Sequence, residues 1–248
     1  MDLEKQTEAI ITELIRIGYK CPFIYGSWNT FCLYKYDDKL PNDIDVINIV
    51  PEEYEEGEFS VKLDCIDIPV NIECMTLNHL RVELMRGDVK YYTIGFGTIV
   101  PKCANHLLMY LGHIGSVMMT RRNSEIRKIC STASDKAFNK GKEKLTVLED
   151  YDKMLGLKNI WHSIHFIYII THYYNLYRSN TEHEMNIASM KQEFDVLEML
   201  NIRDNIYKIY DETYGDYHVK AQAVIDYAKP IRNKLMTEFR KLYPKEDV

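Results

Sequence analysis

The 248-residue sequence lacks the features that mark secreted, zinc-stapled and membrane-embedded proteins. Its six cysteines form no CxxC pair, so we expect the reduced thiols of a cytoplasmic protein and neither a disulfide framework nor a zinc site. Residues 1–20 are acidic and amphipathic, unlike the basic and then apolar start of a signal peptide. The densest apolar stretch, residues 164–170, is interrupted by His165 and is too short to cross a bilayer. The sequence therefore predicts a soluble protein with no membrane contact.

The chain also lacks a surplus of basic residues, internal repeats and low-complexity segments. Its net charge of −6 argues against binding to a long nucleic-acid duplex, although a local basic patch is still compatible with that charge. Hydrophobic content of 46% and charged content of 27% are ordinary for a globular protein. The length is enough for one large domain or two small ones.

The residue patterns change character near residues 99–101. We expect an α+β domain over residues 1–100, with a mixed sheet and flanking helices, and an all-helical domain over residues 101–248. The elements expected in the first domain are helices over 3–18, 28–36 and 77–85, strands over 22–25, 43–50, 60–66 and 70–75, and a loop with room for one more strand over 87–97. The helices expected in the second domain cover 102–118, 121–139, 159–178, 186–200 and 217–243, with a kink or break at Pro230.

The most informative segment carries two aspartates spaced two apart. In the expected strand, Asp43 and Asp45 project from one face while Ile44 and Val46 pack on the other. Adjacent carboxylates repel each other unless a cation lies between them. A hard divalent ion with oxygen ligands, Mg²⁺ or Mn²⁺, is the natural occupant. Upstream, a strand-to-helix turn at Gly26 and Ser27 would present N–H groups and a hydroxyl to an anion.

A third acid is needed if the site is to hold two metal ions. Glu73 lies in the middle of the expected strand 70–75, on the polar face opposite Val70 and Ile72. Asp64 and Asp67 are alternatives, although we expect Asp67 in a hairpin turn. We therefore prefer Glu73 as the third carboxylate.

This order of elements resembles the signature of the DNA polymerase β-type nucleotidyltransferase superfamily, which is glycine-serine, an acid–apolar–acid strand and an acid on a later strand. The resemblance covers residues 23–75 and includes the short polar Asn42 before the first aspartate. Fifteen residues, 28–42, separate Ser27 from Asp43, more than the family usually has. We expect a longer helix–loop connection to take up the difference.

The resemblance implies roles for these residues. Asp43 and Asp45 would bind both Mg²⁺ ions, and Glu73 would bind one of them and help activate the attacking hydroxyl. Gly26 and Ser27 would hold the terminal phosphates of a nucleoside triphosphate. Pyrophosphate would leave as the metals stabilise the attacking and leaving oxygens.

The second domain carries a local cluster of positive charge. Residues 121–144 contain eight basic side chains against three acidic ones, enough to neutralise a triphosphate or follow a nucleic-acid backbone. Lys140 and Lys142 flank a glycine in an expected loop. Lys158, His162 and His165 share one face of the next helix. We count Lys140, Lys142, Lys158 and His162 as candidate nucleotide-binding residues, with a core role for His162 equally open.

The sequence therefore predicts a Mg²⁺-dependent nucleotidyltransferase that moves a nucleoside monophosphate from an NTP to a hydroxyl acceptor. The acceptor is an RNA end, a protein or a small molecule. Two alternatives stay open: a non-catalytic module that binds a partner, and a regulator that senses NTP without turnover. The sequence leaves the base preference and the oligomeric state open.

Overall fold

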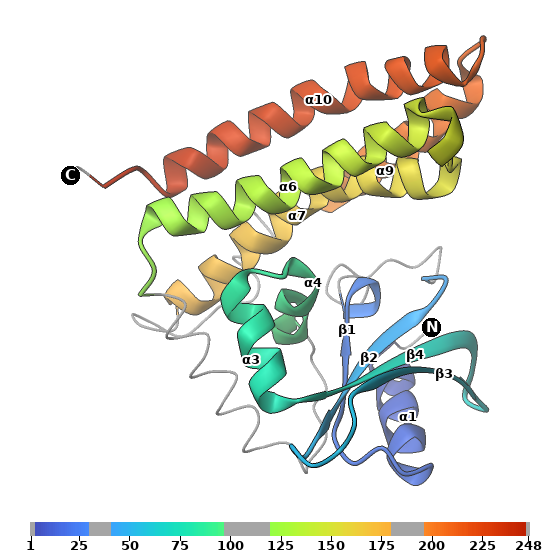
Figure 1. Cartoon of the computed structure of the whole chain (residues 1–248), viewed down its shortest axis with the longest axis vertical. Helices are drawn as coiled ribbons and strands as arrows, with labels where there is room; N and C mark the ends of the chain where they lie inside the picture. The colour runs from blue at the N-terminus through green and yellow to red at the C-terminus, as the bar shows by residue number, and fades with distance from the viewer. Residues whose placement is uncertain (1–2, 30–40, 97–119, 180–195, 247–248) are drawn as a thin grey trace. The chain divides into compact units, whose positions relative to one another are not determined.

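The structure is a computed structural model that describes residues 3–29, 41–96, 120–179 and 196–246. It divides into two compact units, Met1–Met119 and Thr120–Val248, and each is described by itself (Figure 1). The expected domain boundary near residues 99–101 lies outside the described residues. The same holds for the expected helix 102–118 and for most of the expected helix 28–36.

The first unit is built on a mixed four-stranded sheet with the order β1-β2-β4-β3. Its strands are β1 (Pro22–Tyr25), β2 (Ile44–Val50), β3 (Gly57–Leu63) and β4 (Ile66–Thr76). The two central strands, β2 and β4, run parallel, whereas β1 pairs antiparallel with β2 and β3 pairs antiparallel with β4. A mixed sheet with flanking helices is the fold class that the sequence predicts for this part of the chain.

One face of the sheet is closed by α1 (Leu3–Arg16). The helix is amphipathic, and Ile10 and Leu14 bury completely against Ile44 and Val46 of β2. These are the alternate residues of the strand that carries Asp43 and Asp45. Burial of the apolar residues on the α1 face therefore fixes the acidic residues on the opposite face.

The opposite face is covered in part by short helical segments after β4. These are α3 (Leu77–Arg86), α4 (Val89–Tyr92) and the 3₁₀ turn η1 (Thr93–Phe96). Phe23 of β1 packs here against Ile49, Leu77 and Ile94. The expectation of a loop and a further strand over 87–97 is wrong for residues 89–96, which are helical.

The described part of the second unit consists of helices around one apolar core. They are α6 (Asn123–Thr146), α7 (Lys153–Ser179), α9 (Val196–Glu212) and α10 (Tyr217–Leu242), with a 3₁₀ turn η3 (Leu148–Asp150) between the first two. Leu145, Ile160, Ile164, Ile206 and Val224 are fully buried in the core they share. No helix among the described residues has the length and apolar character needed to span a membrane.

Several element boundaries differ from the sequence-based expectations. The turn between β3 and β4 lies at Asp64 and Cys65, so Asp67 belongs to β4 and not to the hairpin turn. Pro230 lies inside the continuous helix α10, so no break occurs there. The helix expected over 186–200 is described only from Val196 onward, and as α9 it continues to Glu212.

The glycine loop expected around Lys140 and Lys142 is part of α6. A Cβ atom on Gly141 would lie 2.8 Å from the backbone nitrogen of Ile160 and 2.9 Å from the carbonyl oxygen of Gly156. The glycine therefore lets α6 approach the backbone of α7 closely. Its role is helix packing, which is why the helix continues through it.

Candidate nucleotide and metal site

The carboxylates predicted from the sequence lie on the face of the sheet opposite α1. In the parallel pair of β2 and β4, Asp45 is directly beside Asn71, and Ile47 is beside Glu73. The side-chain amide of Asn71 donates to Asp43 Oδ2 at 3.4 Å. Asp43 and Asp45 are both partly buried. Asn71 is therefore the residue that the register places next to the aspartate pair, a role that the sequence did not single out.

The turn after β1 approaches Asp45 closely. Gly26 has a φ of +71°, and a Cβ atom on it would lie only 2.8 Å from Asp45 Oδ2. Both its left-handed backbone and this close approach require glycine. The turn predicted at Gly26 therefore reaches the acid-bearing strand across the antiparallel pairing of Tyr25 with Asp45.

Hydrogen bonds that involve Thr93 and Asn29 fix this turn. The Gly26 N–H donates to Thr93 Oγ1 at 2.6 Å, and the Thr93 hydroxyl donates in turn to the Lys90 carbonyl at 2.7 Å. The buried Asn29 amide donates to the carbonyls of Ile24 at 2.6 Å and Thr93 at 2.9 Å. The N–H of Gly26 is thus directed to a threonine hydroxyl, so that anion binding falls to the residues that follow it.

Ser27 is exposed at the start of the helical residues 27–29. The next residue, Trp28, is fully buried, and its indole N–H donates to Thr7 Oγ1 of α1 at 3.0 Å. Trp28 therefore anchors the beginning of this turn to the core while Ser27 faces outward beside the site.

Glu73 is held by three hydrogen-bond donors. Its Oε2 atom accepts from the Tyr25 hydroxyl at 3.0 Å and from Lys90 Nζ at 3.3 Å, and its Oε1 atom accepts from the Tyr91 hydroxyl at 2.8 Å. The two phenol rings lie 5.6 Å apart, and Lys90 Nζ lies 4.4 Å from the centre of the Tyr91 ring. We call Tyr25, Lys90 and Tyr91, together with Glu73, the Glu73 clamp.

The clamp keeps its two phenols protonated. Burial raises the pKa of Tyr25 far above its usual value, and the negative charges of Glu73 and Asp45 raise it further. Burial also raises the pKa of Tyr91, with the hydrogen bond to Glu73 as the next cause. Both hydroxyls therefore act as donors to a carboxylate, and the positive charge in the clamp comes from Lys90.

A pair of helix caps places Lys90 and Tyr91 over Glu73. Gly87 ends α3 in a left-handed conformation with φ of +90°, and the Asp88 side chain then caps α4 by accepting from the Lys90 N–H at 3.2 Å. The dipeptide Gly-Asp is a glycine helix stop followed by an N-cap. That signal was present in the sequence and could have shown that a new helix begins at Val89.

The carboxylates fit a divalent ion unequally. Among the described residues, no three His, Cys, Asp or Glu side chains lie close enough together to hold one metal ion. Asp43 and Asp45 supply the oxygen ligands that Mg²⁺ takes, and Asp45 Oδ2 lies close to Gly26, where a side chain would collide with it. Glu73 already accepts from an ammonium and two phenols. The donor set therefore fits an ion at Asp43 and Asp45 better than it fits one at Glu73.

The remaining candidate residues belong to the second unit. Lys140 and Lys142 are exposed on α6, and Lys158 and His162 lie on α7. The rings of His162 and His165 are 6.4 Å apart, and His165 stacks on Trp161 at 4.8 Å. Burial lowers the pKa of His162 to about 3, with His165 and Lys158 as further causes. This histidine is therefore neutral at pH 7 and offers no positive charge to a phosphate.

Comparison with known proteins gives a likeness to solved structures only. No family model matches the sequence, and no curated protein matches it. Among solved structures, the chain is similar to a nucleotidyltransferase-like protein from Exiguobacterium sibiricum, with 13% sequence identity and a TM-score of 0.29, covering 98% of this chain and 81% of that one. With a likeness of this size, the chemistry of the site has to be argued from the residues of the chain itself.

Proposed function

We propose that the chain is a nucleotidyltransferase that moves a nucleoside monophosphate from an NTP to a hydroxyl acceptor and releases pyrophosphate. Asp43 and Asp45 are its principal metal ligands. The observation that carries the proposal is the close approach of Gly26 to Asp45 Oδ2. This approach brings a turn suited to phosphates next to a pair of carboxylates suited to Mg²⁺ or Mn²⁺.

Each residue of the site has a distinct task in this reaction. Asp43 and Asp45 hold the divalent ion, and Asn71 orients Asp43 through its amide. Ser27 offers its hydroxyl to the terminal phosphates. Thr93 and Asn29 keep the turn in place, so the phosphates meet a preorganised surface. The bound ion would stabilise the charge that develops on the phosphoryl oxygens and on the departing pyrophosphate.

The acceptor in this proposal is a hydroxyl on an RNA end, a protein side chain or a small molecule. The basic residues of α6, including Lys140 and Lys142, are the surface that we assign to a phosphate-bearing acceptor. Exposed lysines along a helix supply the positive charge that such an acceptor requires.

A second candidate function is an NTP-sensing regulator that binds without turnover. The Glu73 clamp is the observation that favours it, because a carboxylate engaged by three donors is poorly placed to activate an attacking hydroxyl. In that case the aspartate pair and the Gly26 turn would still bind the metal–nucleotide complex.

Label transfer distinguishes these functions. The protein is incubated with each α-labelled NTP and Mg²⁺ or Mn²⁺, together with total RNA or lysate protein. Transfer that disappears in Asp43→Asn/Asp45→Asn supports the enzyme. NTP binding without transfer to any acceptor supports the sensor. The absence of both supports a module that acts only through partner contact, and it overturns the proposal.

A matched control comes from Asp67. This carboxylate is exposed on β4, on the same face as Glu73, but it precedes the segment of β4 that pairs with β2. Asp67→Asn removes one surface charge without touching the turn or the aspartate pair. Label transfer by this variant should match that of the unaltered protein.

A further inference from the structure

The third carboxylate of the candidate site is already paired with a cation that belongs to the protein. Lys90 Nζ lies 3.3 Å from Glu73 Oε2, and no histidine, cysteine or further carboxylate completes a three-ligand set with Glu73 among the described residues. A carboxylate that accepts from an ammonium and two phenols has most of its lone pairs engaged. We propose that Lys90 takes the place of a second divalent ion, so that the site binds one ion, at Asp43 and Asp45.

The strand register supports this division of the site. In the pairing of β2 with β4, Glu73 is beside Ile47 and not beside Asp45. The position beside Asp45 is occupied by Asn71, a neutral amide that bonds to Asp43. The aspartate pair and the Glu73 clamp are therefore adjacent but separate charge centres on one face of the sheet.

Two features make the ammonium hard to replace by a metal ion. The Tyr25 and Tyr91 hydroxyls approach Glu73 at 3.0 and 2.8 Å and occupy both of its oxygens, and Mg²⁺ demands near-ideal geometry at short distances. In addition, α4 is fixed by the Gly87 and Asp88 caps, which hold the backbone of Lys90 in place. A second divalent ion at Glu73 would have to displace a phenol and lie beside an ammonium.

This inference rests on the proposed function, since it concerns the ions of the same site. In it, Lys90 is a positioning residue: its charge balances Glu73 and fixes the carboxylate beside the reacting groups. Tyr25 and Tyr91 hold the same carboxylate from its two sides. The clamp thereby supplies the positive charge that a second ion would otherwise bring.

Counting Mn²⁺ ions on the full-length protein tests the inference without any measurement of activity. Free Mn²⁺ is titrated by electron paramagnetic resonance with no nucleotide present. One ion per chain is expected for the unaltered protein. Lys90→Met should add a second ion, because it frees Glu73 of its cation, and Lys90→Arg should keep one. In the double variant Lys90→Met/Glu73→Gln, the second ion should be lost again.

Glu73→Gln alone gives the sharpest contrast. If Glu73 holds no ion, Mn²⁺ affinity should stay within about threefold of that of the unaltered protein, as for a substitution that touches no ligand. Two ions per chain in the unaltered protein, or a loss of about tenfold or more in Glu73→Gln, overturns the inference and leaves the proposed function standing.

Failure of the proposed function gives a different result from failure of this inference. If the unaltered protein binds no Mn²⁺ and Asp45→Asn behaves in the same way, the aspartate pair is not a metal site and the proposed function falls. Lys90 is 43% exposed, so its substitution should leave the fold intact. Far-ultraviolet circular dichroism of each variant checks that it does.

Discussion

Gly26 is the residue whose geometry most constrains the site. A side chain there would adopt an unfavourable left-handed backbone and would also collide with Asp45 Oδ2. We expect Gly26→Ala to lower the free energy of unfolding by about 1–2 kcal/mol from backbone strain alone. It should also abolish Mn²⁺ binding by displacing the Asp45 carboxylate. Urea unfolding and the Mn²⁺ titration measure the two effects.

Gly18 provides a matched control for this substitution. Its φ is +115°, but a Cβ atom there would meet nothing within 4 Å. Gly18→Ala should therefore lower the free energy of unfolding through backbone strain and leave Mn²⁺ binding unchanged. Equal loss of Mn²⁺ binding in both variants would contradict the assignment of Gly26 to the site.

At the scale of helices, Gly141 determines how α6 packs on α7. An added Cβ would press on the backbone of Ile160 and Gly156. Overpacking of this kind costs about 1–3 kcal/mol, against about 1 kcal/mol gained from helix propensity. We expect Gly141→Ala to lower the thermal midpoint of the protein. The exposed neighbour Lys140, replaced by alanine, should change stability by less than about 0.5 kcal/mol.

The three histidines on α7, of which His172 is buried and His162 and His165 are partly exposed, should make the protein less stable in mild acid. Burial lowers the pKa of His165 and His172 to about 4 and that of His162 to about 3. Unfolding returns each pKa to about 6.5, so the unfolded chain binds more protons below that pH. The free energy of unfolding should therefore fall as the pH is lowered from 7 to 5, by at most about 2 kcal/mol for each histidine and by less for partly exposed His162 and His165.

Urea unfolding at pH 7 and pH 5, followed by circular dichroism, measures this effect. His165→Gln should reduce the difference between the two pH values. His218 is exposed on α10, so His218→Gln should leave the difference unchanged. A stability that does not depend on pH over this range would contradict the lowered pKa values of these three histidines.

The sequence predicted those elements whose cause is local. The alternation over residues 43–46 was enough to place Asp43 and Asp45 on the face opposite Ile44 and Val46, because a shift of one residue would turn both aspartates toward the core. The alternation in β4 likewise predicted Glu73 in mid-strand. The apolar face of α1 was readable from its spacing.

Features that depend on contacts with another strand or helix could not be predicted from the local sequence. A hairpin turn was expected at Asp67, but Asp67 and the nearby Pro69 lie in β4, beside the irregular pairing of Val61 and Leu63, where a missing N–H is tolerated. A loop was expected at Gly141 because glycine is common in loops. Its actual role, close packing against the backbone of α7, depends on another helix and could not be inferred from the local sequence. The Glu73 clamp joins side chains of β1, β4 and α4, and no spacing in the sequence connects them.

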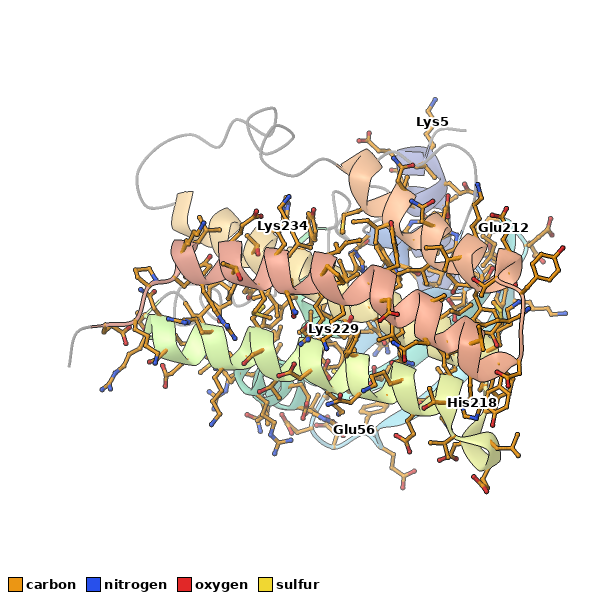
Figure 2. All side chains as sticks on the ribbon, turned by 90° about the horizontal axis from the view of Figure 1, so that it is seen from above. Lys5, Glu56, Glu212, His218, Lys229 and Lys234 are labelled. Atoms are coloured by element: carbon orange, nitrogen blue, oxygen red, sulfur yellow. The ribbon has the colours of Figure 1, made fainter. Side chains whose placement is uncertain are left out.

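At the scale of the whole molecule, positive charge is concentrated on two helices. Together α6 and α10 carry twelve basic and five acidic residues in a chain whose net charge is −6. The two helices pack side by side, and Figure 2 shows Lys229 and Lys234 on α10. One of the five acids, Asp135, is paired with Arg232, and Glu246, which follows α10, accepts from the N-terminal residues of α6. A polyanion therefore meets a surface with a clear excess of positive charge.

If the acceptor is RNA, its binding to this surface should weaken as the salt concentration rises. For a short single-stranded RNA, Lys136→Glu/Lys140→Glu should weaken binding and reduce the slope of log K against log salt by about 1.4, if both lysines contact phosphates. Lys5→Glu/Lys62→Glu makes the same change of charge on exposed residues of the first unit and should have little effect. Equal weakening in the two pairs would contradict a specific role for α6. Fluorescence anisotropy at several salt concentrations measures the slopes.

The most direct test of nucleotidyl transfer is the fate of the γ-phosphate. The protein is incubated with γ-labelled NTP, Mg²⁺ and the acceptor found by α-label transfer, and the released label is separated by chromatography. Nucleotidyl transfer at Asp43 and Asp45 predicts labelled pyrophosphate, equal in amount to the nucleotide transferred and absent in Asp43→Asn/Asp45→Asn. Label released as orthophosphate, or pyrophosphate release that survives loss of both aspartates, would contradict it.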